Sequence, residues 1–396
     1  MKDSIVRSIG QLSDAGVLKF SDGYRTRKDQ LGSGIPILRV AEIKDGRVTV
    51  SRGDCVREEF RGRIGSKVSE QMDVLISTKG SVGRVALVPP GFPQHVYSPQ
   101  LCFLRVVNYS TLDPRWLYYW ASSSAFSAQA QAVQGQTDMA PYISLRDLSR
   151  FRIQVPPLEE QRRIAGVLGA LDDLIAVDEE LIKLVRELAW ARVLEAQSDG
   201  ASDVALADVC VFENRKRVPL SAAQRREIPG TYPYYGAAGQ MGSVGEYLFD
   251  QPRVLVGEDG TVTTGSGNPV VQYVWGQYWV NNHAHVLAGK SISTELLRVL
   301  VGHADIRDRV TGAVQPKLNM GNLKSLRLRI PDDAGVDEFV RLLTHAEREF
   351  RDEVVQCRSA RDDLLPLLIS GRVRVGDTLS GRLPWGAVEA KGQGVN

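Results

Sequence analysis

The longest regular alternation of apolar and polar residues runs from Pro156 to about Gln197. Apolar side chains recur at steps of four and three positions, Asp178 interrupts the series, and no glycine or proline follows Gly169. Such spacing predicts one amphipathic helix whose apolar stripe is wide enough to pack on another helix. At 1.5 Å per residue this helix would be ~60 Å long. We therefore expect a second long helix to cover it.

A fixed shift of 175 positions locates that second helix near the C-terminus, with Glu353 in the place of Asp178. The same shift aligns the strand-like run 141–156 with 316–331. The chain is therefore an internal duplication of a unit that ends in a strand, a proline and a long helix. The residues that we expect to pack the two helices together are Ile164, Leu168, Leu171, Ile175, Phe339, Leu343, Ala346 and Phe350.

The duplication predicts two mixed α/β domains, each followed by a long helix. Runs 35–43 and 73–80 alternate as strands do, and 114–131 predicts a helix whose three large aromatic residues face the core. Run 252–262 matches 72–82 at a shift of 180, which aligns Gly260 with Gly80. The resulting segments are a first domain at 1–156, a helix at 157–198, a second domain at 199–331, a helix at 332–370 and a tail at 371–396.

Composition and charge indicate a soluble protein with basic domains. The formal net charge is only +2, but residues 1–156 hold 21 Lys and Arg against 14 Asp and Glu, whereas 157–198 hold 5 against 9. Basic charge outside the helices suits domains that face a polyanion, although an ordinary solvated surface explains the second half equally well. Four scattered cysteines and the lack of a long apolar run lead us to expect a cytoplasmic protein with reduced thiols.

Two stretches carry residues suited to anion binding. In the first domain, Gly80 and Gly83 allow a tight turn between two strands, and Lys79 and Arg84 flank it. This is either an anion site or a plain hairpin with solvated charges. The second domain begins with the basic run 213–220. His283 and His285, two positions apart, could ligate a metal, but no third ligand is apparent and we expect no metal.

Motifs for catalysis are missing. The chain has no phosphate-binding G-x-x-x-x-G-K-[ST] loop, no Asn/Asp-Pro-Pro-aromatic motif for amino methylation and no glycine-rich cofactor loop that opens a helix. The E-x-K at Glu389–Lys391 lies in the tail without a supporting strand, so we discount it as a nuclease motif. The residues therefore favour a binding protein.

Four stretches resemble the DNA-specificity subunits of Type I restriction–modification systems. They are PPLEEQRRIAGVL at the start of the first helix, STKGSVGRVALV, YPYYGAAGQMGSVGEYLFDQPRVLVGEDGTV, and LLPLLISGRVRV near the end of the second helix. PPLEEQRRIAGVL, at the start of the first long helix, is the most specific of these stretches. The second copy, IPDDAGVDEF, departs from it because it lacks the Pro-Leu-x-x-Gln core.

This resemblance implies an α+β fold in which two target-recognition domains are joined by two long antiparallel helices in a pseudo-two-fold repeat. It implies a non-catalytic subunit whose domains each read one half of a bipartite, asymmetric double-stranded DNA target. The helices would act as a ruler and dock two methyltransferase subunits, which restriction subunits then join. The subunit itself would need no cofactor, since S-adenosylmethionine, ATP and Mg²⁺ belong to the partner subunits.

Two kinds of residue are expected to contact DNA, namely cations at phosphates and polar loop residues at bases. Glutamines before each helix, Gln134, Gln136 and Gln315, could read adenine edges, but the pattern favours ordinary polar loop residues. The alternatives are a methylation-only system, a restriction enzyme of another class and a protein-interaction scaffold. The residues that we expect to form the DNA-binding set are Arg25, Arg27, Lys28, Lys79, Gly80, Arg84, Gln136, Arg215, Lys216, Arg217 and Lys317.

Overall fold

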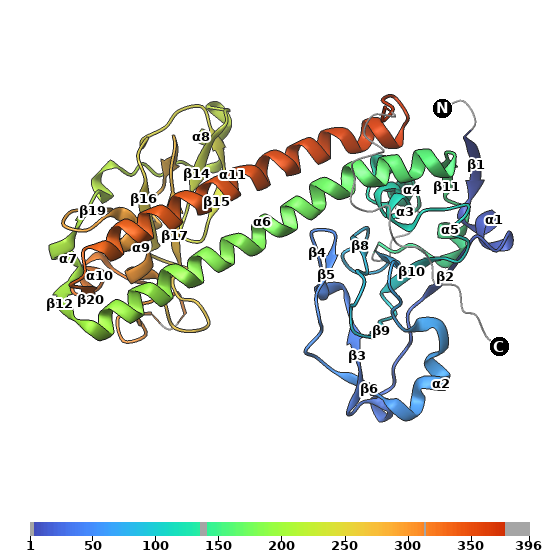
Figure 1. The fold of residues 1–396 in the computed structure, drawn as a ribbon, viewed down its shortest axis with the longest axis horizontal. Coiled ribbons are helices and arrows are strands. Elements are labelled where there is room, and N and C mark those ends of the chain that lie inside the picture. Colours follow the sequence, from blue (N-terminus) through green and yellow to red (C-terminus); the bar gives the residue numbers. More distant parts are fainter. Residues whose placement is uncertain (1–3, 135–140, 313, 377–396) are drawn as a thin grey trace. The chain divides into compact units, whose positions relative to one another are not determined.

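The computed structural model describes residues 4–134, 141–312 and 314–376. It divides into two compact units (Figure 1). Unit 1 comprises Met1–Ala176 and Val355–Asn396, and unit 2 comprises Val177–Val354. Each long helix therefore contributes one segment to each unit, whereas the sequence-based segments treated the helices as separate parts.

Within its described residues, unit 1 holds three sheets. The largest has the order β2 (Leu18–Asp22), β10 (Leu101–Val106), β7 (Val74–Ser77), β8 (Val85–Leu87), β5 (Arg47–Val48) and β4 (Ile43–Lys44). The other two are β6 (Cys55–Arg57), β3 (Gly34–Leu38) and β9 (Val96–Tyr97), and the pair β1 (Ile5–Ser8) and β11 (Arg152–Val155). The short helices are α1 (Ile9–Asp14), α2 (Arg61–Ile64), α3 (Pro114–Ala121), α4 (Ser124–Gln134) and α5 (Leu145–Arg150).

Unit 2 repeats this plan with fewer strands in its described part. Its main sheet has the order β13 (Cys210–Phe212), β19 (Ala284–Gly289), β16 (Arg253–Gly257) and β17 (Val271–Val274). The others are β15 (Gln240–Val244), β14 (Tyr232–Tyr235) and β18 (Trp279–Val280), and the pair β12 (Ala201–Ala205) and β20 (Arg327–Pro331). The short helices are α7 (Leu206–Val209), α8 (Ala222–Glu227), α9 (Thr294–Gly302) and α10 (Met320–Lys324).

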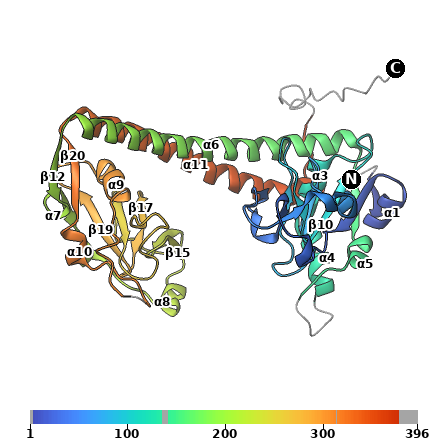
Figure 2. The same ribbon diagram turned by 90° about the horizontal axis from the view of Figure 1, so that it is seen from below.

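The two units confirm the internal duplication. Strand order β13-β19-β16-β17 reproduces β2-β10-β7-β8, and the terminal pair β12-β20 reproduces β1-β11. The parallel contact of β14 with β18 likewise reproduces that of β3 with β9. In Figure 2, α3 lies between the long helices and β10 in unit 1, and α9 lies between them and β19 in unit 2.

Each main sheet is buried on both faces, as the alternation of its central strands requires. In β7, Val74 and Ile76 join the core under the helices, while Leu75 joins the core shared with the three-stranded sheet. In β16, Val254 and Leu255 divide between two cores in the same way.

The helix expected over 114–131 is two helices, which corrects the sequence-based prediction. It breaks at Ser122 and Ser123, where the Ser123 hydroxyl donates to the Trp120 carbonyl at 2.7 Å and competes with the helical hydrogen bonds. The core role of its aromatic residues is confirmed, because Trp116, Tyr119 and Trp120 are buried.

The long helices are α6 (Leu158–Asp199) and α11 (Gly335–Ile369). Gln161 explains the specific entry of α6, since its buried amide donates to the carbonyls of Thr111 and Pro156 and accepts from the Asp113 N–H. At the position 175 residues later α11 has Val336, which is also fully buried. The missing glutamine of the second copy is therefore replaced by apolar packing.

Salt bridges pair the helices antiparallel in each unit. In unit 1, Arg361 of α11 donates to Asp172 of α6 at 2.9 Å. In unit 2, Arg186 of α6 donates to Glu347 of α11 at 2.7 Å. The shift of 175 maps Asp172 onto Glu347 and Arg186 onto Arg361. The two salt bridges are therefore equivalent, but the acid comes from α6 in one and from α11 in the other.

The residues expected to pack the helices together differ in burial. Ile164, Leu168 and Ile175 of α6 are fully buried, and the first two also join the core of unit 1. The remaining members of the set, Leu171, Phe339, Leu343, Ala346 and Phe350, are half-buried. On α11 the most buried side chains lie one position away from the expected row, and they include Val340, Thr344 and Glu347.

Glu347 joins three helices. Its side chain is 1% exposed and also accepts from Arg298 of α9 at 2.5 Å. Burial alone would raise the pKa of Glu347, but Arg298 and Arg186 outweigh burial and hold the pKa below its ordinary value. The carboxylate is thus ionised and fully compensated at neutral pH.

In the described residues, no helix combines the length and the apolar composition that crossing a membrane requires.

We predict that Glu347→Ala lowers the free energy of unfolding by about 3–5 kcal/mol, because it leaves the buried Arg298 without its carboxylate. Urea denaturation of the full chain measures this change. The control is Glu180→Ala, which removes an exposed partner of Lys183 and should cost no more than about 1 kcal/mol. Equal losses in the two variants would contradict the three-helix role of Glu347.

Asp178, the polar interruption of the helix pattern, gives a second prediction. Its side chain is 2% exposed and its Oδ2 has no hydrogen-bond partner among the described residues. Burial and the nearby Glu353 raise its pKa. The ionised carboxylate therefore destabilises the folded chain at neutral pH, and protonation relieves this cost as the pH falls.

Asp178→Asn should accordingly raise the midpoint of thermal unfolding at pH 7, and the gain should shrink toward acidic pH. Scans of wild type and variant between pH 7 and pH 4 provide the measurement. Glu187→Gln, which neutralises an exposed acid on the same helix, should show no such trend. A variant less stable than wild type at pH 7 would mean that Asp178 has a compensating partner.

Candidate nucleic-acid interface

The predicted DNA-binding residues of unit 2 lie at one end of its main sheet. Phe212 at the end of β13 pairs with Leu287, and Gly257 at the end of β16 pairs with Ala284. Because both strands are antiparallel to β19, the loops that follow them meet beside the start of β19. These loops are 213–217 and 258–260, and a backbone bridge between Asp259 and Lys317 adds a third segment.

Unit 1 has the same arrangement at the start of β10. The segments that follow β2 and β7 flank residues 98–100, and Lys79 forms the backbone bridge, here with Tyr142. Gly23 permits the close approach, because a Cβ at this position would lie 2.0 Å from the Ser98 carbonyl oxygen. The turn itself is also duplicated, since Gly80 has φ 76° and Gly260 has φ 83°, a conformation that favours glycine.

Several predicted DNA-binding cations project freely from these sheet ends. They are exposed, and their charged groups make no hydrogen bond or ion pair within the part of the chain that the structure describes. Free exposed cations at one edge can neutralise phosphate groups without breaking any protein contact. This group comprises Arg25, Arg27, Lys28, Lys79 and Arg215.

Other predicted residues already have protein partners. The Arg84 guanidinium donates to the Val40 and Ile43 carbonyls at 3.3 Å and 3.1 Å. Lys216 donates to Glu213 at 2.6 Å, and Lys317 lies 3.9 Å from Glu258. These cations can reach DNA only by sharing or exchanging their present contacts.

The predicted base-reading glutamines are not brought together by the described structure. Gln134 is half-buried at the end of α4, and Gln315 is exposed beside Lys317. Gln136 lies outside the described residues. Their contact with bases remains a prediction.

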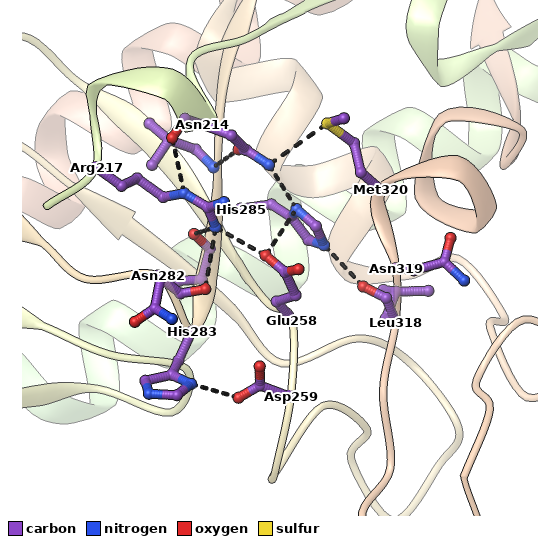
Figure 3. A network of polar contacts seen from close by, with 12 residues as sticks. Asn214, Arg217, Glu258, Asp259, Asn282, His283, His285, Leu318, Asn319 and Met320 are labelled. Carbon is purple, nitrogen blue, oxygen red and sulfur yellow. Dashed lines mark hydrogen bonds and ion pairs between the residues drawn. The ribbon is translucent and has the colours of Figure 1, made fainter. Parts of the chain in front are cut away.

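Arg217 belongs to a buried polar network rather than to the exposed surface (Figure 3). Its side chain is 14% exposed and donates to Glu258 at 2.8 Å and to the Ala284 carbonyl at 2.7 Å. We predicted that Arg217 contacts DNA because it follows Arg215 and Lys216 in the sequence. In the structure its guanidinium instead holds together the loops that carry the exposed cations.

His285 is the centre of this network. It is fully buried, its Nε2–H donates to the Leu318 carbonyl at 2.7 Å, and its Nδ1 accepts from the Asn214 amide at 2.9 Å. Burial lowers the pKa of His285 against the opposing effect of the Leu318 hydrogen bond. The neutral imidazole therefore cross-links the loop after β13 to the segment before α10. Both ring nitrogens are occupied, and no cluster of metal-ligating side chains occurs among the described residues.

Residue type and spacing did not single out Asn214, Glu258, Gln100 and Tyr142. Tyr142 could have been found from the duplication, because the shift of 175 aligns it with Lys317. Equivalent positions in the two units therefore carry different polar side chains. Asn214 and Glu258 gave no signal, because their roles depend on segments that meet only in the folded chain.

Comparison with known proteins identifies the family. The model of the Type I restriction modification DNA specificity domain matches residues 2–187 and 199–344, so it covers both copies of the duplication. The chain belongs to this family.

Relatives named as type I restriction enzyme specificity subunits support this assignment. One from Methanocaldococcus jannaschii is 20% identical over 89% of this chain and 91% of its own length. One from Haemophilus influenzae is 29% identical, but the match spans only 35% of each chain. The EcoBI specificity subunit of Escherichia coli is 26% identical over 42% of this chain and 33% of its own length.

A solved structure shows that the fold is shared. The crystal structure of a Type I restriction–modification S subunit from M. genitalium matches 92% of this chain and 96% of its own with a TM-score of 0.58, at 16% identity. The specificity-subunit family and the doubled α+β fold thus agree with the expectation from the sequence.

Arg217 and Arg215 provide a matched pair for testing the network. Arg217→Ala should lower the free energy of unfolding by about 2–5 kcal/mol, because Glu258 and three backbone carbonyls lose their donor inside the protein. Arg215→Ala should change it by no more than about 0.5 kcal/mol, because its exposed side chain has no such contact. Chemical denaturation of the two full-length variants measures both. Similar losses would remove the distinction between a structural arginine and a surface arginine.

Proposed function

We propose that this chain is the DNA-specificity subunit of a Type I restriction–modification system and that it reads a bipartite, asymmetric duplex. The observation that carries the proposal is the repeated sheet end. Both units have the same backbone arrangement there, but the polar side chains on it differ. A repeated scaffold suits the repeating phosphate backbone, and unlike side chains suit two unlike base sequences. The names of the relatives support the same function.

Affinity in this proposal comes from the exposed cations at the two sheet ends. Arg25, Arg27 and Lys28 follow β2 in unit 1, and Arg215 follows β13 in unit 2 at the corresponding place. Each cation that contacts a phosphate releases counterions, so binding weakens as the salt concentration rises. Lys79 adds a further phosphate contact in unit 1.

The long helices have two proposed roles. Because each contributes a segment to both units, α6 and α11 set the spacing between the half-sites. They also dock methyltransferase subunits. In unit 2 the α6 segment presents Val177, Leu184 and Leu188, which are 54%, 51% and 50% exposed and share one helix face with Leu181. An exposed apolar row of this kind indicates a protein partner.

Catalysis belongs to those partners. The sequence lacks the motifs for methyl transfer, nucleotide hydrolysis and DNA cleavage, and the chain's own residues supply positioning and recognition. S-adenosylmethionine, ATP and Mg²⁺ are therefore assigned to the methyltransferase and restriction subunits.

The test is a comparison of methylated DNA motifs in the host with and without the gene. Sequencing that detects methylated bases should reveal one motif with two specified parts and an unspecified gap, present only when the gene is present. The two parts should differ in sequence, because the two units carry different side chains. Identical methylation in both strains, or loss of an uninterrupted motif, would contradict the proposal.

A further inference from the structure

Gln100 of unit 1 and His283 of unit 2 occupy equivalent positions in the duplicated sheet end. The Thr78 N–H donates to the Gln100 carbonyl at 2.8 Å, and the Glu258 N–H donates to the His283 carbonyl at 2.8 Å. Thr78 and Glu258 each follow the end of a corresponding strand, β7 or β16, and each precedes the duplicated turn. The backbone thus aligns Gln100 with His283 although their separation, 183 positions, differs from the helix shift.

A second pair of backbone bonds fixes this alignment. The Ile143 N–H donates to the Thr78 carbonyl at 3.0 Å, and the Leu318 N–H donates to the Glu258 carbonyl at 2.8 Å. Ile143 and Leu318 are themselves related by the shift of 175. Three segments therefore meet in the same way in both units, and a side chain at position 100 or 283 leaves the sheet end at the same place.

Both side chains are available to a ligand. Gln100 is exposed, and its amide makes no hydrogen bond in the part of the chain that the structure describes. His283 is 49% exposed. The sheet end that carries Gln100 also holds the free cations Lys79 and Arg25, and the sheet end that carries His283 holds the free cation Arg215. A duplex held by these cations would bring its bases toward the two polar groups.

Asp259 orients the ring of His283. Its Oδ1 accepts from Nδ1 at 2.5 Å, and its side chain is only 19% exposed. The His283 backbone N–H is held by the Asn281 side chain at 2.8 Å. Figure 3 shows this pair apart from the buried His285 network. In the neutral form of the imidazole, Nδ1–H donates to Asp259 and the other nitrogen, Nε2, is a hydrogen-bond acceptor.

The chemistry of these groups suits base edges. A glutamine amide donates and accepts side by side, which matches N7 and the amino group of adenine in the major groove. An imidazole Nε2 acceptor matches the amino group of adenine or cytosine. Asp259 takes the position of Lys79 in unit 1, and a carboxylate there would repel a phosphate. Its contact with His283 gives that carboxylate a different role.

We propose that Gln100 and His283 are the base-reading residues of the two half-sites and that Asp259 is the positioning residue that orients His283. This inference rests on the proposed function and names the side chains that discriminate bases within it. Each residue determines one position in its own half-site and none in the other.

The experiment complements a strain lacking the gene with full-length variants and reads the methylated motif by sequencing. The variants are Gln100→Ala, His283→Ala, His283→Gln, Asp259→Ala and Asp259→Asn. Two controls carry the same substitutions at exposed sites away from the sheet ends, Gln154→Ala on β11 and His345→Ala on α11. Protein abundance in the cell and the unfolding midpoint of each purified chain are measured in parallel.

We expect discrimination at one position of one half-site to fall roughly tenfold or more for Gln100→Ala, and at one position of the other half-site for His283→Ala. His283→Gln should change the preferred base at that same position. Asp259→Ala should relax the position read by His283, whereas Asp259→Asn, which can still accept from Nδ1–H, should retain most of the preference. The controls should leave the motif unchanged.

Two outcomes would overturn the inference while leaving the proposed function intact. One is a wild-type gapped motif that the stable, abundant Gln100 and His283 variants retain without change. The other is a uniform loss of methylation across all sequences by stable variants, which indicates phosphate contacts. If wild-type complementation restores no gapped motif, the proposed function itself fails.

Discussion

One ion pair, used twice, fixes the architecture of this protein. Asp172 pairs with Arg361 in unit 1, and Glu347 pairs with Arg186 in unit 2, so the same acid and base positions join the two long helices at both places. Each acid also receives a hydrogen bond from the short helix beneath it, from Tyr119 of α3 or from an arginine of α9. The contact that pairs the helices therefore also holds each α/β domain against them.

Duplication keeps this framework and frees the sheet ends to diverge. The backbone bonds of Thr78 before Gly80 recur at Glu258 before Gly260, and both glycines have a positive φ. The side chains on that backbone are not the same, and the buried support differs as well. Unit 2 uses the His285 network to hold its loops, whereas the corresponding turn of unit 1 relies on the buried Ser77 hydroxyl, which accepts from the Arg84 N–H. A common scaffold with separate surfaces is what an asymmetric target requires.

The sequence predicted the long helices, the duplication and the turn that Lys79 and Arg84 flank, because these follow from periodicity and from short-range strand and turn patterns. It did not predict the break in the 114–131 helix, which depends on one serine hydroxyl, or the burial of Arg217. Arg217 and its neighbour Arg215 are indistinguishable by residue type and spacing. Only the meeting of loops some 40 to 70 residues apart separates a structural arginine from a free one.

The most direct test of the central claim lengthens the helices and measures the gap in the recognised DNA. One heptad inserted after Asp178, with a second after the equivalent Glu353, adds about 10.5 Å to both helices while preserving their apolar stripes. The account predicts that both half-site sequences persist in the methylated motif and that the gap grows by about three base pairs at ~3.4 Å each. A stable, active variant with the original gap would contradict it.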